Sequence, residues 1–461
     1  MTQTDIMFYF SFAAVGMFYT FFKFGINRTS LLMILVFWEG LFDYFDDFVG
    51  LSGILSILNI YKIALVIYAL SISWKNFFSG FNNKSDLIVN TAFALFSASF
   101  WITYYFYGGA LSTILSQYLY KYAFVWIAYH YFKDINYNIP KREYVKSLLM
   151  TILSVQISIS TFKIFLEGFE FEYEGLVGSM SYGGGGPAVV IPIVALIFYW
   201  LIRNGSFNKK DWIYAFMILI IAIASGKRQP VIIYPAVLLA LFVFVSKSVR
   251  LSALFKYVPI AFLFFYIGVR SNTTFTPEGV VGGRFDILFV RDYVMKYYFG
   301  TTKINEIFSE DFQGVGRGAG FALYFKPKLL SLMGDKEILF GKGRYEVAVQ
   351  TKGMITDTRS GSYGIQHTGL LGETASLLYS FGYVGSILLF FMGLSIIFSV
   401  KNKRFAWVIF SYFLWDFLFY YNEVLFFNSS GLIVLIIIHY ANSVEIEKRA
   451  YLKPHLQIAN R

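Results

Sequence analysis

The chain of 461 residues contains no cysteine. Without a thiol it can have no disulfide framework, no thiolate nucleophile and no cysteine-ligated metal site. Histidine is almost as rare, with four residues in the whole chain, too few and too scattered for a histidine cluster. We therefore expect neither a metal ion nor another cofactor.

Charged residues are scarce as well, at 15% of the chain, compared with about 25% in a typical soluble domain. Hydrophobic residues make up 57%, which excludes an ordinary globular enzyme. A transmembrane helix needs about 20 mostly apolar residues, because hydrocarbon offers no partner for a bare backbone amide. Runs of that kind recur along the sequence, so the composition predicts an all-α polytopic membrane protein.

Apolar runs separated by charged or Gly/Asn-rich breaks predict about 12–14 transmembrane helices. They cover residues 6–22, 30–42, 57–74, 87–106, 111–132, 147–166, 187–202, 211–225, 230–246, 257–270, 374–400, 405–421 and 429–442. The first run is expected to be a span rather than a cleavable signal peptide. No basic stretch precedes it, and no Ala-x-Ala-like cleavage site follows it.

The connections between these runs alternate in charge. Every second connection carries lysine or arginine, as at Lys133 and Lys141, whereas the others are acidic or uncharged where they are short, as at Asp43 and Asp46. By the positive-inside rule the basic connections are cytoplasmic, with the N-terminus outside and the C-terminus inside. Most of the net charge of +11 thus belongs to the membrane topology, and we expect no nucleic-acid partner.

Two connections on the predicted outer side depart from this pattern. One is the turn 225–230, with sequence SGKRQP, which carries two positive charges on the side where positive charge is selected against. The other is a large loop, residues 270–373, with thirteen lysines and arginines against eleven acids. We therefore divide the chain into N-terminal transmembrane helices (1–269), a large extracytoplasmic loop domain (270–373), and C-terminal transmembrane helices with a cytoplasmic tail (374–461).

Arginines at this outer edge are the first candidates for chemistry. Arg228 sits where a helix emerges from the bilayer, and its planar fork of donors suits a phosphate at headgroup height. Binding of ordinary phospholipid headgroups is the alternative. In the loop, Arg270 follows a span, and Arg284 and Arg291 belong to a segment with helical spacing of basic and aromatic residues. That spacing predicts an amphipathic helix lying along the membrane surface, or simple interfacial packing.

His367 lies in the sequence HTGLLGE shortly before the chain re-enters the membrane. An imidazole there can act as a general base or hydrogen-bond a diphosphate. A structural histidine is the alternative, since a lone histidine marks no site by itself.

Together these features resemble the O-antigen polymerase and ligase superfamily, the Wzy-type polymerases and WaaL-type ligases of bacterial surface polysaccharide assembly. The matching pieces are a Ser-Gly-x-Arg turn (Ser225, Gly226, Arg228), an arginine in the loop (Arg284), a Phe-Gly-x-Gly step (Phe340, Gly341, Gly343), and a histidine before a Phe-Gly-x-x-Gly (His367, Phe381, Gly382, Gly385). Their order and rough spacing match over residues 211–400. The chain differs in having Thr368 after the histidine and a long insertion between Arg284 and Gly341.

The resemblance implies a metal-independent membrane glycosyltransferase of the bacterial inner membrane, with its active site on the periplasmic or extracytoplasmic side. Such an enzyme polymerises undecaprenyl-diphosphate-linked oligosaccharide repeat units of O-antigen or capsule. Arg228 and Arg284, with Arg291 and Arg270, would bind the donor diphosphate and stabilise the leaving group, and His367 would orient or deprotonate the acceptor hydroxyl. Membrane lipids and a chain-length regulator are the further expected partners.

Other functions stay open from the sequence. An O-antigen ligase would share this chemistry, and a lipid-linked oligosaccharide flippase or transporter would share the helices. A transporter places polar residues within its spans, and the candidates here are Glu39, Lys62, Lys121, Lys163, Asp416 and Glu423. A peptidoglycan-type polymerase would depend on a loop carboxylate, for which Asp286, Asp292 and Asp357 are available.

Overall fold

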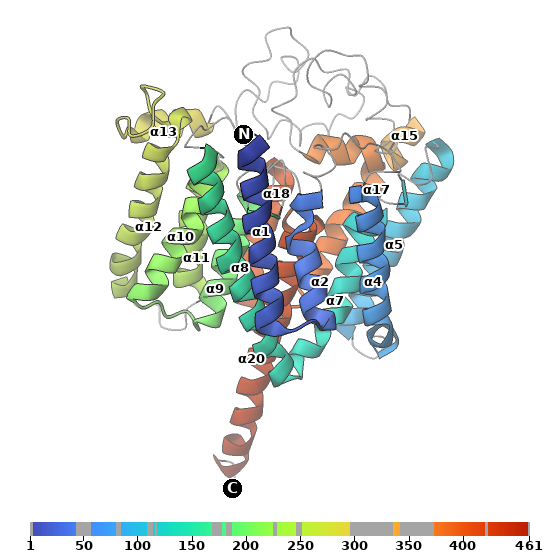
Figure 1. Ribbon diagram of the computed structural model, residues 1–461. Helices are drawn as coiled ribbons and strands as arrows, with labels where there is room; N and C mark the ends of the chain where they lie inside the picture. The colour runs from blue at the N-terminus through green and yellow to red at the C-terminus, as the bar shows by residue number, and fades with distance from the viewer. Residues whose placement is uncertain are drawn as a thin grey trace.

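The computed structural model describes residues 3–42, 57–79, 84–107, 114–115, 118–167, 178–180, 187–224, 228–245, 251–295, 335–341, 373–419 and 423–459. This part of the chain is helical throughout and contains no strand. Most of its helices run roughly side by side as a bundle, with α13 and α15 across one end and the C-terminal part of α20 extending from the other (Figure 1).

The helices follow the predicted apolar runs. They are α1 (Gln3–Phe24), α2 (Arg28–Phe37), α4 (Ile57–Ser79), α5 (Lys84–Tyr107), η3 (Tyr118–Ala123), α7 (Phe124–Phe132), η4 (Lys133–Asn136), α8 (Ile139–Glu167), α9 (Pro187–Ile202), α10 (Lys209–Ala224), α11 (Gln229–Ala240), η5 (Leu241–Val245), α12 (Leu251–Ser271), η6 (Thr273–Phe275), α13 (Ile287–Val294), α15 (Asp335–Phe340), α17 (Glu373–Ile397), α18 (Lys403–Phe419), α19 (Glu423–Phe426) and α20 (Asn428–Ala459). Each predicted run coincides in whole or in part with one helix or two consecutive ones.

Six of these helices are long and apolar enough to cross a membrane. The qualifying segments are Met7–Phe24, Ile57–Asn76, Lys84–Phe106, Ile139–Leu166, Ser380–Ile397 and Asn428–Ala450. Three shorter apolar segments are Arg28–Phe37, Ala188–Ile202 and Gln229–Val245. The fold is therefore that of an all-α membrane protein with at least six candidate spans among the described residues, and the total of 12–14 stays a prediction.

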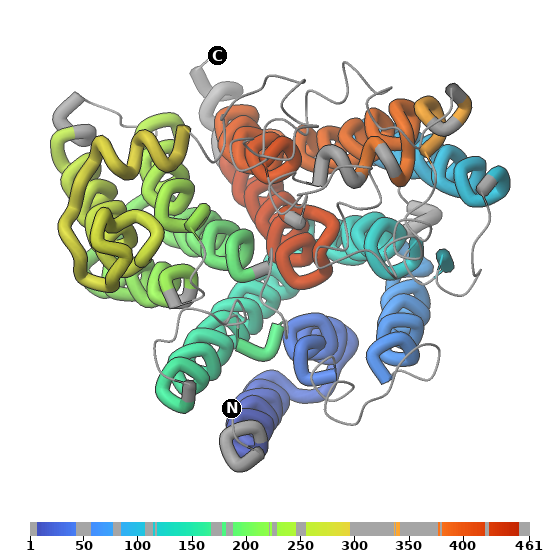
Figure 2. The backbone as a smooth tube through the Cα atoms, turned by 90° about the horizontal axis from the view of Figure 1, so that it is seen from above, coloured from blue at the N-terminus to red at the C-terminus, as the bar shows by residue number. Residues whose placement is uncertain are grey.

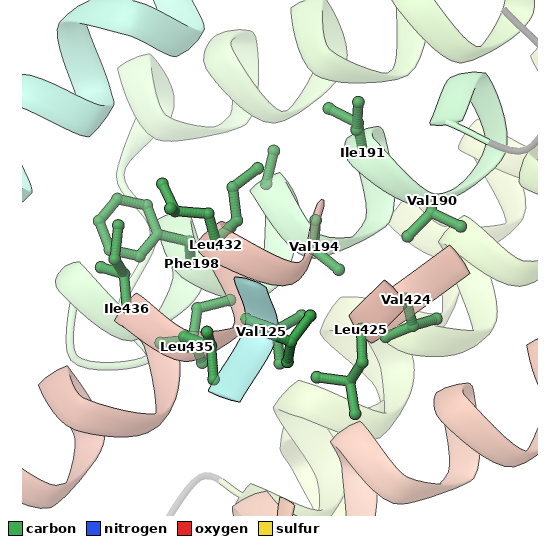
Figure 3. Close-up of a cluster of buried hydrophobic side chains, with 14 of the residues drawn as sticks. Val125, Val190, Ile191, Val194, Phe198, Val424, Leu425, Leu432, Leu435 and Ile436 are labelled. Atoms are coloured by element: carbon green, nitrogen blue, oxygen red, sulfur yellow. The ribbon is translucent and has the colours of Figure 1, made fainter. Parts of the chain in front are cut away.

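The core of the bundle is built from helices that are apolar on every side. Val190 and Val194 of α9 pack with Leu425 of α19 and with Leu432 and Ile436 of α20, all at most 2% exposed (Figure 3). A helix that is hydrophobic all round must be covered by other helices or by lipid. Here α9 and the first half of α20 are covered by protein, so they form the centre around which the other helices are arranged (Figure 2).

Predicted cytoplasmic connections meet one another at one end of the bundle. Lys133 forms an ion pair with Asp86 at 2.5 Å, and Arg142 forms one with Glu447 at 2.9 Å. The backbone N–H of Lys401 donates to the side chain of Asn442 at 2.7 Å. The structure thus gathers connections from α5, α7, α8, α17 and α20 at this end, which we call the basic end. The side of the membrane that it faces stays a prediction.

Candidate functional site

Arg228 lies at the opposite end of the bundle from the basic end, immediately before α11. Pro230 stands in the first turn of α11, where its missing N–H costs no hydrogen bond and its fixed φ favours a helix start. The guanidinium is half-buried, and its Nη1 donates to the hydroxyl of Tyr293 on α13. The Arg228 Cζ atom also lies 5.4 Å from the centre of the Tyr293 ring, within the range of a cation–π contact.

A small apolar cluster holds α13 in place over Arg228. Val290 of α13 is 3% exposed and packs with Val231 of α11, Val269 of α12 and Phe275 of η6. The rings of Phe275 and Tyr293 meet edge to face, 5.3 Å apart and at 90°. As a result α13 lies across the ends of α11 and α12 (Figure 1), and it is seen again over these helices from above (Figure 2).

The amphipathic helix predicted in the loop is present over Ile287–Val294. Asp286 caps its N-terminus, with its carboxylate accepting from the backbone N–H groups of Leu288 and Phe289 at 3.0 and 3.1 Å. Arg284 therefore stands before the helix rather than within it. Ile287 and Leu288 are 51% and 58% exposed, so one side of α13 presents apolar side chains outward, as a membrane-surface helix does.

Arg284 and Arg291 are the exposed cations on either side of this cap. Their side chains are 70% and 63% exposed, and among the described residues each forms an ion pair with a neighbouring acid, Asp286 at 3.5 Å and Asp292 at 2.7 Å. Exposed ion pairs of this kind contribute roughly 0–1 kcal/mol. Both guanidinium groups can therefore exchange these partners for a phosphate at little cost.

Arg270 has a different environment. Its Nε donates to the carbonyl of Gly283 at 3.1 Å, its Nη1 donates to the Tyr266 hydroxyl at 3.1 Å, and its Nη2 donates to the carbonyl of Gly282. The Gly282 N–H donates back to the Arg270 carbonyl at 2.7 Å. Arg270 thus closes the turn that leads from α12 to Arg284, so it positions the loop and has fewer donors left for a ligand.

Two Phe-Gly steps that are 41 residues apart in the sequence touch one another. Gly341 follows α15 with φ +75°, and Gly382 interrupts α17 with φ +62° and ψ −166°. A Cβ atom on Gly341 would overlap the backbone of Ser380 and Phe381, and one on Gly382 would overlap the backbone of Leu339 and Phe340. The Phe-Gly steps at 340 and 381 therefore form one close backbone crossing. Only glycine fits both the space and the dihedral angles.

The structure brings some predicted site residues together and leaves others apart. Arg228 contacts α13, Arg291 lies on it, and Arg270 and Arg284 lie in the segment that leads to it from α12, whereas α15 and the glycine crossing that follows it are at the opposite edge of the same end (Figure 1). His367, Thr368 and Ser225 lie outside the described residues. The loop boundaries proposed at 270 and 373 coincide with the last residues of α12 and the first residue of α17.

Sequence reasoning missed two residues beside Arg228. The sequence indicated no partner for Arg228, whereas in the structure the Tyr293 hydroxyl accepts a hydrogen bond from its guanidinium. Gln229 is 2% exposed, and neither its Nε2 nor its Oε1 has a hydrogen-bond partner among the residues that the structure describes. Tyr293 is three residues after the buried Val290, so helical spacing could have turned it inward. No sequence signal marks Gln229 as buried.

Three of the six polar residues named within the predicted spans contact aromatic rings or backbone. The Lys62 Nζ atom lies 4.7 Å from the ring centre of Tyr120, and the Lys163 Nζ atom lies 5.3 Å from that of Tyr9. The buried Asp416 carboxylate accepts from the backbone N–H of Val424 at 3.2 Å. Within the described ranges, no three His, Asp or Glu side chains are grouped to hold a metal ion.

In comparisons with known proteins, no family model, curated protein or solved structure matches this chain.

Proposed function

We propose that this chain is a membrane glycosyltransferase that polymerises lipid-diphosphate-linked oligosaccharide repeat units, as its resemblance to the O-antigen polymerase and ligase superfamily implies. The single observation that carries the proposal is the group of arginines around α13. Arg228 contacts Tyr293 of α13 at the end of the bundle, Arg284 is exposed just before α13, and Arg291 is exposed on α13 itself. A lipid diphosphate brings its negative charge to the surface of the hydrocarbon, which is the depth that a helix end provides.

The chemistry that we assign to these residues is glycosyl transfer. A hydroxyl oxygen of the acceptor sugar attacks the anomeric carbon of the donor glycan, and the bond from that carbon to the diphosphate oxygen breaks. The lipid diphosphate leaves with the electron pair, and the hydroxyl proton passes to a base, the role proposed for His367. Arg228 and Arg284 stabilise the charge that develops on the leaving diphosphate, because a guanidinium donates two parallel hydrogen bonds to phosphate oxygens.

The proposed location follows from the charge of the connections. With the basic end in the cytoplasm, α13 and its arginines face the extracytoplasmic side of the bacterial inner membrane. The donor is then undecaprenyl-diphosphate-linked oligosaccharide, and a chain-length regulator is a proposed partner. An O-antigen ligase, and a flippase or transporter of lipid-linked sugars, are the functions from which the polymerase must be distinguished.

The test is to delete the gene in its host, complement the deletion with variants and separate the surface polysaccharide on a gel. Arg228→Ala and Arg284→Ala are each expected to abolish the polymer ladder while a single capped repeat unit remains. Arg449→Ala is the matched control, because this arginine pairs only with Glu445, near the C-terminal end of α20, and should leave the ladder unchanged.

His367→Ala is expected to give the same phenotype as the arginine variants, with all proteins quantified in membranes by immunoblot. Loss of every surface sugar, including the single repeat unit, would indicate a ligase or a flippase instead. A normal ladder from Arg228→Ala, Arg284→Ala and His367→Ala alike would overturn the assignment of the site.

A further inference from the structure

A groove of about 660 Å³ lies between α11–η5 and α18. Its walls are single helix faces: Ile233, Ala236, Ala240 and Phe244 succeed one another at three to four residues on one side. On the other side the same spacing gives Arg404, Trp407, Val408, Ser411 and Trp415. The volume lies within the range of about 300–1,000 Å³ that is usual for small-molecule sites. The lining is mostly apolar, with Ser411 and Tyr412 as its uncharged polar residues and one charged residue, at one end.

That charged residue is Arg404, at the basic end of the bundle. It is exposed and forms no ion pair with any residue in the described part of the chain. Trp407, one turn further along α18, is 55% exposed beside it. Tryptophan and arginine at one level are typical of the boundary between headgroups and hydrocarbon. The groove thus has a cationic, interfacial mouth and an apolar interior.

The length of the groove matches one acyl chain. Ile233 and Phe244 are eleven positions apart, as are Arg404 and Trp415, which is about 16 Å along each helix axis. Half of the hydrocarbon core of a bilayer, the depth that one acyl chain fills, is about 15 Å. A molecule with its anionic group at Arg404 can therefore lay an acyl chain along the groove.

From a guanidinium with no ion-pair partner among the described residues, the exposed tryptophan beside it and a length that suits one acyl chain, we infer that this groove binds an anionic phospholipid of the leaflet at the basic end. Its phosphate accepts hydrogen bonds from Arg404, and an acyl chain lies against Ala236, Ala240 and Trp415. The site does not depend on the proposed transferase activity. Its charged mouth is at the opposite end of α11 from Arg228, so it binds a different headgroup.

A second groove supplies a comparison. Between α1 and α8 a space of about 470 Å³ also has a cation at the basic end, Lys23, but its Nζ atom already donates to Thr151 at 3.0 Å. Arg404 has no such protein partner among the described residues. We therefore expect headgroup preference at the α11–α18 groove rather than at the α1–α8 groove.

The experiment is native mass spectrometry of the purified full chain, titrated with phosphatidylglycerol or with phosphatidylcholine of the same acyl chains. The wild type is expected to retain phosphatidylglycerol preferentially, and Arg404→Ala should weaken that binding about tenfold, the usual loss for one charge-assisted contact. Arg404 is exposed, so this variant should fold. Arg28→Ala, which removes an exposed arginine from the start of α2 at the same end, is the matched control and should bind as the wild type does.

A bulky side chain inside the groove tests whether an acyl chain lies there. Ala240→Phe is expected to weaken binding of both phospholipids to the same extent, whereas Arg404→Ala should weaken binding of the anionic one more than that of phosphatidylcholine, in which the choline already balances the phosphate charge. Equal binding of phosphatidylglycerol by the wild type and Arg404→Ala would overturn the inference. So would displacement of the lipid by undecaprenyl diphosphate with the same affinity in both proteins, because the groove would then hold the isoprenoid chain of the substrate.

Discussion

At the scale of single residues, the candidate site depends on what each guanidinium already contacts. The Arg270 guanidinium donates to the carbonyls of Gly282 and Gly283, so its role is to hold the turn between α12 and Arg284. The side chains of Arg284 and Arg291 pair with the neighbouring acids Asp286 and Asp292, and both guanidinium groups are mostly exposed. Arg228 lies between these cases, because Tyr293 orients the group without neutralising its charge. The four arginines look alike in the sequence, and their contacts separate them.

The unpartnered side chain of Gln229 permits a prediction about stability. Burying an amide without hydrogen bonds costs about 1–3 kcal/mol in proteins. Gln229→Leu is therefore expected to raise the free energy of unfolding by about 1–2 kcal/mol, measured by thermal unfolding of the purified protein in detergent.

The matched control is Gln156→Leu, since Gln156 is also fully buried but is hydrogen-bonded. Its Nε2 donates to Ser179 Oγ at 2.8 Å, and its Oε1 accepts from the Ser179 N–H at 2.7 Å. This variant should lower the free energy of unfolding by about 1–3 kcal/mol. If both variants were destabilised equally, Gln229 would have a partner after all.

At the scale of elements, the glycine crossing joins a short helix of the loop to a long apolar helix. The backbone of α15 rests on α17 at Gly341 and Gly382, and the hydroxyl of Thr103 on α5 donates to the carbonyl of Phe340. Aromatic contacts add to this junction, since the ring centres of Phe381 on α17 and Phe100 on α5 lie 5.7 Å apart. The crossing therefore fixes where the described part of the loop before α17 meets the bundle.

Replacing Gly382 tests this junction. Gly382→Ala places a Cβ atom into the backbone of Leu339 and Phe340 and also forces alanine into a region of φ and ψ that only glycine adopts readily. We expect the free energy of unfolding to fall by about 3 kcal/mol or more, from strain and overlap together.

Gly279→Ala separates these two effects. Gly279 also has a positive φ, +68°, but a Cβ atom there would meet nothing within 4 Å. Its substitution should cost only the conformational term, about 1–2 kcal/mol. Losses of the same size in both variants would show that the close approach at Gly382 contributes nothing.

At the scale of the whole molecule, the two ends of the bundle differ in character. One end collects the basic connections and the extension of α20, and the other carries α13 and α15 (Figure 1). The arginines around α13 and the glycine crossing lie at opposite edges of the second end. The proposed transferase requires this end to face the extracytoplasmic side.

The absence of cysteine makes the orientation directly testable. Val281 is 50% exposed in the loop before α13, and Tyr137 is 68% exposed between α7 and α8. With Val281→Cys, a membrane-impermeant maleimide should label intact spheroplasts. With Tyr137→Cys, labelling should require permeabilisation, because that connection is predicted to be cytoplasmic. The unsubstituted chain is the blank, and the reverse labelling pattern would contradict the orientation.

The sequence by itself determined the positions of the helices and the charge asymmetry of their connections. Apolar length and basic residues are local properties, so the thirteen predicted runs coincide with helices and the basic connections meet at one end. It also predicted α13, although its start was set at Ile287 by the Asp286 cap rather than at Arg284.

Only the tertiary structure decided which partners these elements have. The bond from Arg228 to Tyr293, the loop closure by Arg270, the crossing of Gly341 with Gly382 and the groove ending at Arg404 all join residues that are distant in the sequence or on separate helices. Such contacts depend on how helices pack, and a pattern of apolar residues does not specify which helix faces which. For that reason the sequence was enough to predict the candidate arginines, whereas the packing decides which of them have donors left for the proposed diphosphate.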